Sequence, residues 1–238
     1  AGSYIDFTAK NNIENYGEIL GTTNTTLTST FGNVNNYGSG KITGGFGVVT
    51  INALNGEFNN KAQTSLFTSN NNAIFNVKDL QNTGEISVAN DLTTNVTNNL
   101  TNNQTALIWA GNDATFNVAN IFLNNQADIY ANRHLTIRKN SANEKTTSLQ
   151  NISGNIETYE GDILINAVNL DNKTNTNLTQ KILSILDARY YNGSGDFGAF
   201  DIYEGRLVYS IDGSISDIKS STIQSGKDLT INTNSLNN

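Results

Sequence analysis

The sequence contains no cysteine, no proline and no methionine. Without cysteine, a disulfide scaffold, a thiolate metal site and a cysteine nucleophile are all excluded. The absence of proline is typical of strands that lie between two neighbours, because such strands must donate their N–H groups and proline has none. Because the initiator methionine is also missing, we expect an interior fragment of a longer protein.

Basic residues and long apolar runs are also scarce. Only 14 of the 238 residues are lysine or arginine, and the formal net charge is −7. Nucleic acids and anionic lipids are bound by clustered basic side chains, so we expect no nucleic-acid partner. No run of 18 apolar residues occurs, and we therefore expect no insertion into a membrane.

Asparagine and threonine are abundant, with 42 and 28 residues respectively. An apolar residue, any residue and then asparagine form a motif that recurs about every 22 residues. The asparagines of this motif, which we predict to form a structural ladder, are Asn15, Asn36, Asn60, Asn82, Asn102, Asn125, Asn151, Asn172 and Asn238. The last interval equals about three such periods.

Short runs between these asparagines alternate apolar and polar residues, which predicts half-buried strands. Short strands at a constant long period favour a solenoid over a sandwich. We therefore predict an all-β fold, a right-handed parallel β-helix with about 22 residues per coil. In such a helix the same asparagine recurs above its predecessor, so the side-chain amides can bond along the axis. Asparagine also tolerates the backbone conformation of a tight corner.

The repeat is interrupted near residues 175–221. We predict a β-helix over 1–174, an irregular aromatic and acidic segment over 175–221, and a further repeat coil over 222–238. Residues 178–186 fit either a short helix or a buried strand. The segment is an insertion, a cap or a set of degenerate coils. If it is a protruding loop, aromatic side chains suit a receptor contact. The candidates are Tyr190, Tyr191, Phe197, Phe200, Tyr203 and Tyr209.

Chemistry-bearing residues are few. The single histidine, His134, occupies a repeat position that aspartate fills elsewhere, and we predict a structural role for it. Trp109 follows an aliphatic run and is predicted to pack in the core or at a corner rather than to form a sugar-stacking platform. We predict no catalytic residue, no metal site and no cofactor. The alternative from another class is a carbohydrate-active β-helix enzyme that uses Asp196 or Asp201.

Two stretches, LQNISGNIETYEGDILINAVNLDNKT (149–174) and TIQSGKDLTINTNSLNN (222–238), resemble the filamentous-haemagglutinin repeats of large two-partner-secreted exoproteins. This group includes adhesins, haemolysins and CdiA-type effectors of contact-dependent growth inhibition. The resemblance covers about residues 1–174 and 222–238. The family's amino-terminal secretion domain carries Asn-Pro motifs, so a chain without proline does not contain it.

The resemblance implies a β-helical filament that an outer-membrane partner transporter exports to the surface of a Gram-negative bacterium. It also implies that the filament projects a binding or toxin-delivery element toward a neighbouring cell. The expected partner there is an outer-membrane protein or a glycan receptor. A segment of a host-directed haemagglutinin or haemolysin is the alternative within the family.

Overall fold

The computed structural model describes residues 3–175, 179–195, 198–212 and 220–238. The chain divides into two units, of which the first contains Ala1–Thr174 and Lys219–Asn238 and the second contains Asn175–Ile218. Every regular element in the described ranges is a strand. The first unit is a parallel β-solenoid of about 8 turns with a repeat of about 22 residues, so the predicted parallel β-helix is confirmed.

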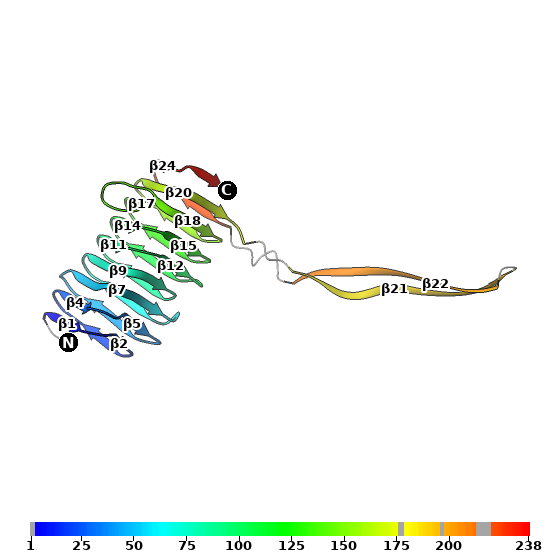
Figure 1. Ribbon diagram of the computed structural model, residues 1–238, viewed down its shortest axis with the longest axis horizontal. Helices are drawn as coiled ribbons and strands as arrows, with labels where there is room; N and C mark the ends of the chain where they lie inside the picture. Colours follow the sequence, from blue (N-terminus) through cyan, green and yellow to red (C-terminus); the bar gives the residue numbers. More distant parts are fainter. Residues whose placement is uncertain (1–2, 176–178, 196–197, 213–219) are drawn as a thin grey trace. The chain divides into compact units, whose positions relative to one another are not determined.

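Each complete coil contributes a strand to three faces, all paired in parallel. The first face consists of β1 (Ile5–Ala9), β4 (Thr25–Ser29), the first part of β7 (Val49–Lys61), the first part of β9 (Ala73–Asn82), β11 (Leu92–Val96), β14 (Ala114–Val118), β17 (Leu135–Arg138), the first part of β20 (Ile163–Lys173) and β24 (Leu229–Asn232). Figure 1 shows these strands stacked in chain order.

The second face follows the first around a corner, and three long strands continue across that corner. It consists of β2 (Ile13–Asn15), β5 (Val34–Tyr37), the last parts of β7 and β9, β12 (Leu100–Asn103), β15 (Ile121–Asn125), β18 (Thr146–Ile152), the last part of β20 and β25 (Ser235–Asn237). Because β7, β9 and β20 belong to both faces, the two faces form one 15-stranded sheet.

The third face is a separate 8-stranded sheet. It consists of β3 (Glu18–Leu20), β6 (Lys41–Gly44), β8 (Leu66–Ser69), β10 (Glu85–Val88), β13 (Leu107–Ala110), β16 (Asp128–Ala131), β19 (Asn155–Thr158) and β23 (Thr222–Gln224). In β11, β12 and β10, one strand from each face, the residues alternate between the interior and the outer surface, as a side-chain period of two requires.

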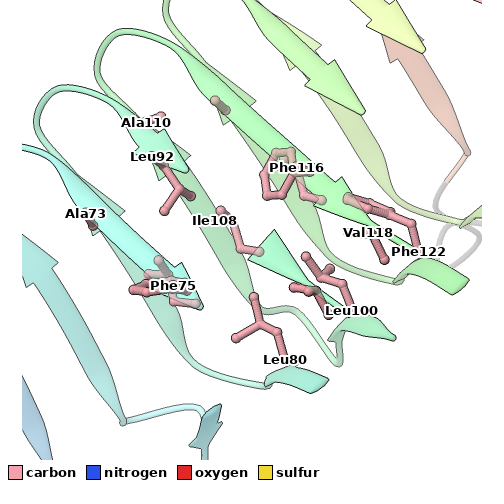
Figure 2. Close-up of a cluster of buried hydrophobic side chains, with 14 of the residues drawn as sticks. Ala73, Phe75, Leu80, Leu92, Leu100, Ile108, Ala110, Phe116, Val118 and Phe122 are labelled. Carbon is pink, nitrogen blue, oxygen red and sulfur yellow. The ribbon is translucent and has the colours of Figure 1, made fainter. Parts of the chain in front are cut away.

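The core is built from apolar columns that run along the stack. On the third face, for example, Ile42, Phe67, Ile86 and Ile108 are successive register partners and all are buried. Figure 2 shows core side chains from the three faces directed into the interior between the strands. Phe67 and Phe75 meet edge to face with ring centroids 4.9 Å apart. Aromatic and β-branched residues suit these positions because they pack well on a pleated surface.

The second unit is an antiparallel pair in which β21 (Thr179–Gly195) lies against β22 (Gly198–Asp212). Of the predicted alternatives for this segment, an insertion agrees with the separate unit, whereas degenerate coils do not, because coils of this solenoid pair in parallel. Of the two alternatives for 178–186, a short helix or a strand, the described part of that range is strand. Both strands are rich in β-branched and aromatic residues, which favour extended backbone. Leu178 lies outside the described residues.

Asparagine ladders and candidate binding surfaces

A buried ladder of asparagine side chains runs along the corner between the second and third faces. Each Nδ2 atom donates to the Oδ1 atom of the next asparagine, with distances of 2.6 to 2.9 Å. The members, in order, are Asn15, Asn36, Asn60, Asn82, Asn102, Asn124, Asn151, Asn172 and Asn238. This inner ladder joins every coil from β2 to the last residue.

Backbone carbonyl groups fix the direction of the inner ladder. The second hydrogen of Asn82 Nδ2 is donated to the carbonyl of Leu107 at 3.1 Å, in the following coil. Asn102 donates in the same way to the carbonyl of Asp128 at 3.1 Å. Because the nitrogen must face these carbonyls, each Oδ1 atom is left to accept from the preceding asparagine. Most of these side chains are fully buried and bonded at both ends, which is a structural arrangement rather than a ligand site.

The predicted ladder residue Asn125 is wrong by one position, and Asn124 takes its place. Asn125 points outward and donates to Asn103 Oδ1 at 2.9 Å. Phe122 is buried and pairs with Leu100, whereas Leu123 is turned to the other side. Two consecutive apolar residues followed by two consecutive asparagines fit the motif in either register. A shift of one residue exchanges the two faces of a strand, so the motif alone does not choose between them.

A second ladder, which the sequence analysis missed, lies on the outer surface of the first face. Asn76 donates to Asn52, Asn95 to Asn76 and Asn117 to Asn95, with distances of 2.8 to 2.9 Å. Arg138 closes this outer ladder by donating from Nε to Asn117 Oδ1 at 2.9 Å. A Thr-x-Asn pattern at residues 50–52, 93–95 and 115–117 is the signal that could have revealed it.

His134 belongs to a column of side-chain acceptors at the corner between the third and first faces. Asp113 Oδ1 accepts from the backbone N–H of His134 at 3.1 Å. His134 Nδ1 in turn accepts from the N–H of Asp162 at 3.2 Å, and Asp162 Oδ1 accepts from the N–H of Asp228 at 3.1 Å. His134 therefore accepts the N–H of the next coil at a position where aspartate does so elsewhere.

The aromatic candidates for receptor contact lie on the strands of the antiparallel pair. Tyr190 in β21 is opposite Tyr203 in β22. Tyr191 is opposite Ile202, Tyr209 is opposite Ile182, and Phe200 is opposite Gly193. Phe197 and the alternative catalytic residue Asp196 lie outside the described residues, whereas Asp201 is opposite Asn192. The register thus brings Tyr190 and Tyr203 together, although they are 13 positions apart in the sequence.

Trp109 lies on the outer surface of the third face, so it does not pack in the core; its indole lies against Gly111 at the corner that follows β13, which agrees with the predicted packing at a corner. Its neighbours in β13, Ile108 and Ala110, are buried, and the alternation of the strand turns Trp109 outward. The register partner of Trp109 in the next coil is Tyr130. The Tyr130 ring stacks on Tyr159, with centroids 5.9 Å apart.

Polar groups surround these aromatic side chains. Asn155 Nδ2 donates to Asp128 Oδ1 at 3.0 Å and to the Tyr130 hydroxyl at 3.4 Å. Burial raises the pKa of Tyr130 above its ordinary value, and the negative charges of Asp128 and Glu157 raise it further, while the bond from Asn155 opposes them. Asp128 and Glu157 therefore lie close enough to Tyr130 to oppose its ionisation.

Within the described ranges, no group of three or more His, Cys, Asp or Glu side chains is placed to hold a metal ion. The same part of the chain contains no helix that is long and apolar enough to cross a membrane. No protein-family model matches the sequence, and no curated protein or solved structure matches it significantly. The fold itself places the chain among parallel β-solenoid proteins.

Proposed function

We propose that this chain is a rod-forming segment of an adhesive filament at the surface of a Gram-negative bacterium. The observation that carries the proposal is the continuity of the solenoid across the inserted unit. Asn172 donates to Asn238 at 2.6 Å, and β20 pairs with both β24 and β25, although 66 residues separate the two asparagines. The coils resume in register as if residues 175–218 were absent.

This architecture suits a protein that carries a binding element on a stiff support. In a solenoid each coil contacts only its neighbours, so a rod can lengthen without a change in its core. An insertion between two coils that leaves their pairing intact can vary in sequence while the rod stays constant. We propose that the inserted unit contacts a receptor and that the aromatic residues of β21 and β22 take part.

The finer assignment rests on the resemblance of residues 149–174 and 222–238 to filamentous-haemagglutinin repeats. It adds export through an outer-membrane partner transporter, and delivery of a binding or toxic element to a neighbouring cell in the manner of a CdiA-type effector. Its alternative is a host-directed haemagglutinin or haemolysin. In either case we propose binding rather than catalysis, with an outer-membrane protein or a glycan as the receptor.

The test compares the 238-residue chain with a variant in which a short Gly-Ser linker replaces residues 175–218. Circular dichroism and thermal unfolding should show an intact solenoid in both, because the deletion spares every coil. We expect the intact chain to bind either Gram-negative cells or epithelial cells in a fluorescent binding assay, and the deletion variant to bind neither. Bacterial binding supports the growth-inhibition role, and epithelial binding supports the host-directed one.

Two point variants refine this test. Tyr190→Ser and Tyr203→Ser change the antiparallel pair, and Tyr16→Ser is the matched control because Tyr16 is a 70% exposed tyrosine on the solenoid. The first two should weaken cell binding and the control should not. Equal binding by the deletion variant would show that the inserted unit is not the binding element. Failure of the intact chain to bind either cell type would contradict the adhesive function.

A further inference from the structure

Side chains tie successive coils together at the corner between the third and first faces. Among the described first-face strands, six are preceded by a residue whose backbone N–H is bonded to a side chain of the preceding coil, at 2.9 to 3.2 Å. The side chains that accept these bonds form what we call the corner column. Its members are Asn24, Asn72, Asp91, Asp113, His134 and Asp162. Each member fixes the point at which the next coil enters the first face.

His134 differs from the other members of the corner column in its chemistry and not in its place. An asparagine oxygen accepts a hydrogen bond at every pH, and an aspartate carboxylate accepts one until it protonates near about pH 4. Imidazole takes up a proton between about pH 5 and 8, and both ring nitrogens are then donors. Because His134 Nδ1 is the atom that accepts from the Asp162 N–H at 3.2 Å, protonation at Nδ1 removes this bond.

The Asp162 carboxylate is placed to receive the protonated ring. Its Oδ2 atom lies 3.4 Å from His134 Nδ1, and its Oδ1 atom accepts from the N–H of Asp228 at 3.1 Å. The side chains of His134 and Asp162 are 42% and 45% exposed, so water screens an ion pair between them and the pair contributes little. The exchange of a backbone hydrogen bond for an exposed ion pair therefore loosens the turn before β20.

Water and other charged groups reach the ring from several sides. His134 lines a pocket of about 460 Å³ together with Arg133, Glu160 and Lys227, and the backbone of Gly161 and Gly226 contributes to the same pocket. The charged side chains at this corner are Asp113, Arg133, Glu160, Asp162, Lys227 and Asp228. Acidic and basic groups are both present, and the pocket gives solvent access to the imidazole. The ring can therefore take up a proton without burial of an isolated charge.

The corner at His134 lies next to the coil from which the inserted unit leaves. Asp162 immediately precedes β20, which pairs with β17 and β18 on one side and with β24 and β25 on the other. The second unit begins at Asn175, two positions after β20 ends at Lys173. Since each coil of a solenoid contacts only its neighbours, a loosened corner here stays local to these coils.

We propose that His134 makes this corner an acid-sensitive joint of the solenoid. Proton uptake by the imidazole breaks the bond from the Asp162 N–H, and the ring pairs instead with the Asp162 carboxylate. The proton comes from solvent, and no covalent bond of the chain changes. As the pH falls through the range in which imidazole protonates, the turn before β20 opens more often, while the corners closed by asparagine or aspartate stay shut. The joint goes beyond the proposed adhesive function and does not depend on it.

Nuclear magnetic resonance tests the joint directly, because the single histidine gives one ring signal. The intact chain, labelled at histidine and aspartate, is titrated from about pH 8 to about pH 5. We expect solvent exchange of the Asp162 amide, corrected for its intrinsic pH dependence, to rise about two- to tenfold along the titration curve of the ring, as loss of one hydrogen bond requires. The Asp113 amide, bonded to Asp91 Oδ1 at 3.2 Å, is the internal control and should keep its protection.

Two variants separate the proton from the contact. His134→Asn introduces the residue that Asn72 provides in the same column, so the coil should fold and the Asp162 amide should keep its protection at every pH. His134→Asp, with the residue found at Asp113, should behave in the same way over this range. An Asp162 amide that keeps its protection while the wild-type ring protonates, or that loses it equally in His134→Asn, would overturn the proposal. The measurement needs no receptor, so its result is separate from that of the cell-binding test.

Discussion

The inner and outer ladders use the same residue and nearly the same hydrogen-bond length in two different environments. In the inner ladder, Asn102 is fully buried and bonded to two asparagines and a backbone carbonyl. In the outer ladder, Asn95 is half-buried and bonded only to its neighbours along the stack. Water can replace the lost partner in the second case but not in the first. The difference teaches that pairing of asparagines marks the period of the solenoid, while burial decides how much each pair stabilises it.

The largest effect is expected from Asn102→Ala in the inner ladder. The substitution leaves Asn124 Oδ1 without its side-chain donor, removes the side-chain bond to the Asp128 carbonyl and removes the acceptor of Asn82 Nδ2. Because each buried orphan costs on the order of 1–3 kcal/mol, we expect the free energy of unfolding to fall by about 3–4 kcal/mol. Urea unfolding followed by circular dichroism measures it. A loss below about 1 kcal/mol would show that the inner ladder marks the repeat without stabilising it.

Thr94→Val tests a buried polar side chain that has no hydrogen-bond partner in the described part of the chain, whereas Asn102 is buried and fully bonded. Thr94 lies in the inward column between Phe75 and Phe116, and its Oγ1 atom has no hydrogen-bond partner among the described residues. Valine has nearly the same shape and no hydroxyl to desolvate. We therefore expect a gain of about 1 kcal/mol in the free energy of unfolding, measured in the same urea titration. A loss of stability would mean that the hydroxyl is bonded in solution, and the contrast with Asn102 would then weaken.

Asn95→Ala in the outer ladder should have a smaller effect. The substitution breaks two side-chain bonds, to Asn76 and from Asn117, of 2.8 and 2.9 Å. Water reaches these groups, so the expected loss is about 0.5 kcal/mol or less. The matched pair is Asn102→Ala, which makes the same chemical change in the buried ladder. Equal losses in the two variants would contradict the role assigned to burial.

Much of the fold follows from the sequence because the solenoid repeats one physical problem in every coil. Each coil needs, at the corner between its second and third faces, a residue whose amide can donate twice and accept once, and asparagine at a constant period indicates that need. The register at Asn124 could not be read, since the sequence Phe-Leu-Asn-Asn offers two equivalent choices and only packing of Phe122 decides. In β13 it is Ile108 and Ala110 that face the interior, so the alternation of the strand turns Trp109 outward.

The remaining differences concern residues whose role depends on partners in other coils. His134 could be assigned a structural role from its position in the repeat, but its function as an acceptor for the N–H of Asp162 depends on a contact 28 residues away. The antiparallel pair of β21 and β22 was not predicted because its pairing is local and ignores the period of the coils. A sequence repeat with a fixed period predicts contacts between successive coils. It does not predict the structure of an inserted segment that lacks the repeat.

The smallest effect is a pH dependence that should appear on the outside of the solenoid and not in the inner ladder. The pKa of Tyr130 is raised above 10.0, chiefly by burial and also by Asp128 and Glu157. The contribution of this tyrosine is therefore complete below the pKa of an unfolded tyrosine and is lost as pH rises through the folded value. Phenylalanine at position 130 cannot ionise. The free energy of unfolding should therefore fall less in Tyr130→Phe than in the wild type when the pH is raised from 8 to above 10. Comparison of tyrosinate absorbance between wild type and Tyr130→Phe should show that Tyr130 ionises above the pKa of an unfolded tyrosine. The difference between wild type and Asn102→Ala should stay constant over the same range, because the inner ladder has no ionisable side chain. Two results would contradict this prediction. One is a difference in stability between wild type and Asn102→Ala that changes with pH, and the other is a difference between wild type and Tyr130→Phe that does not.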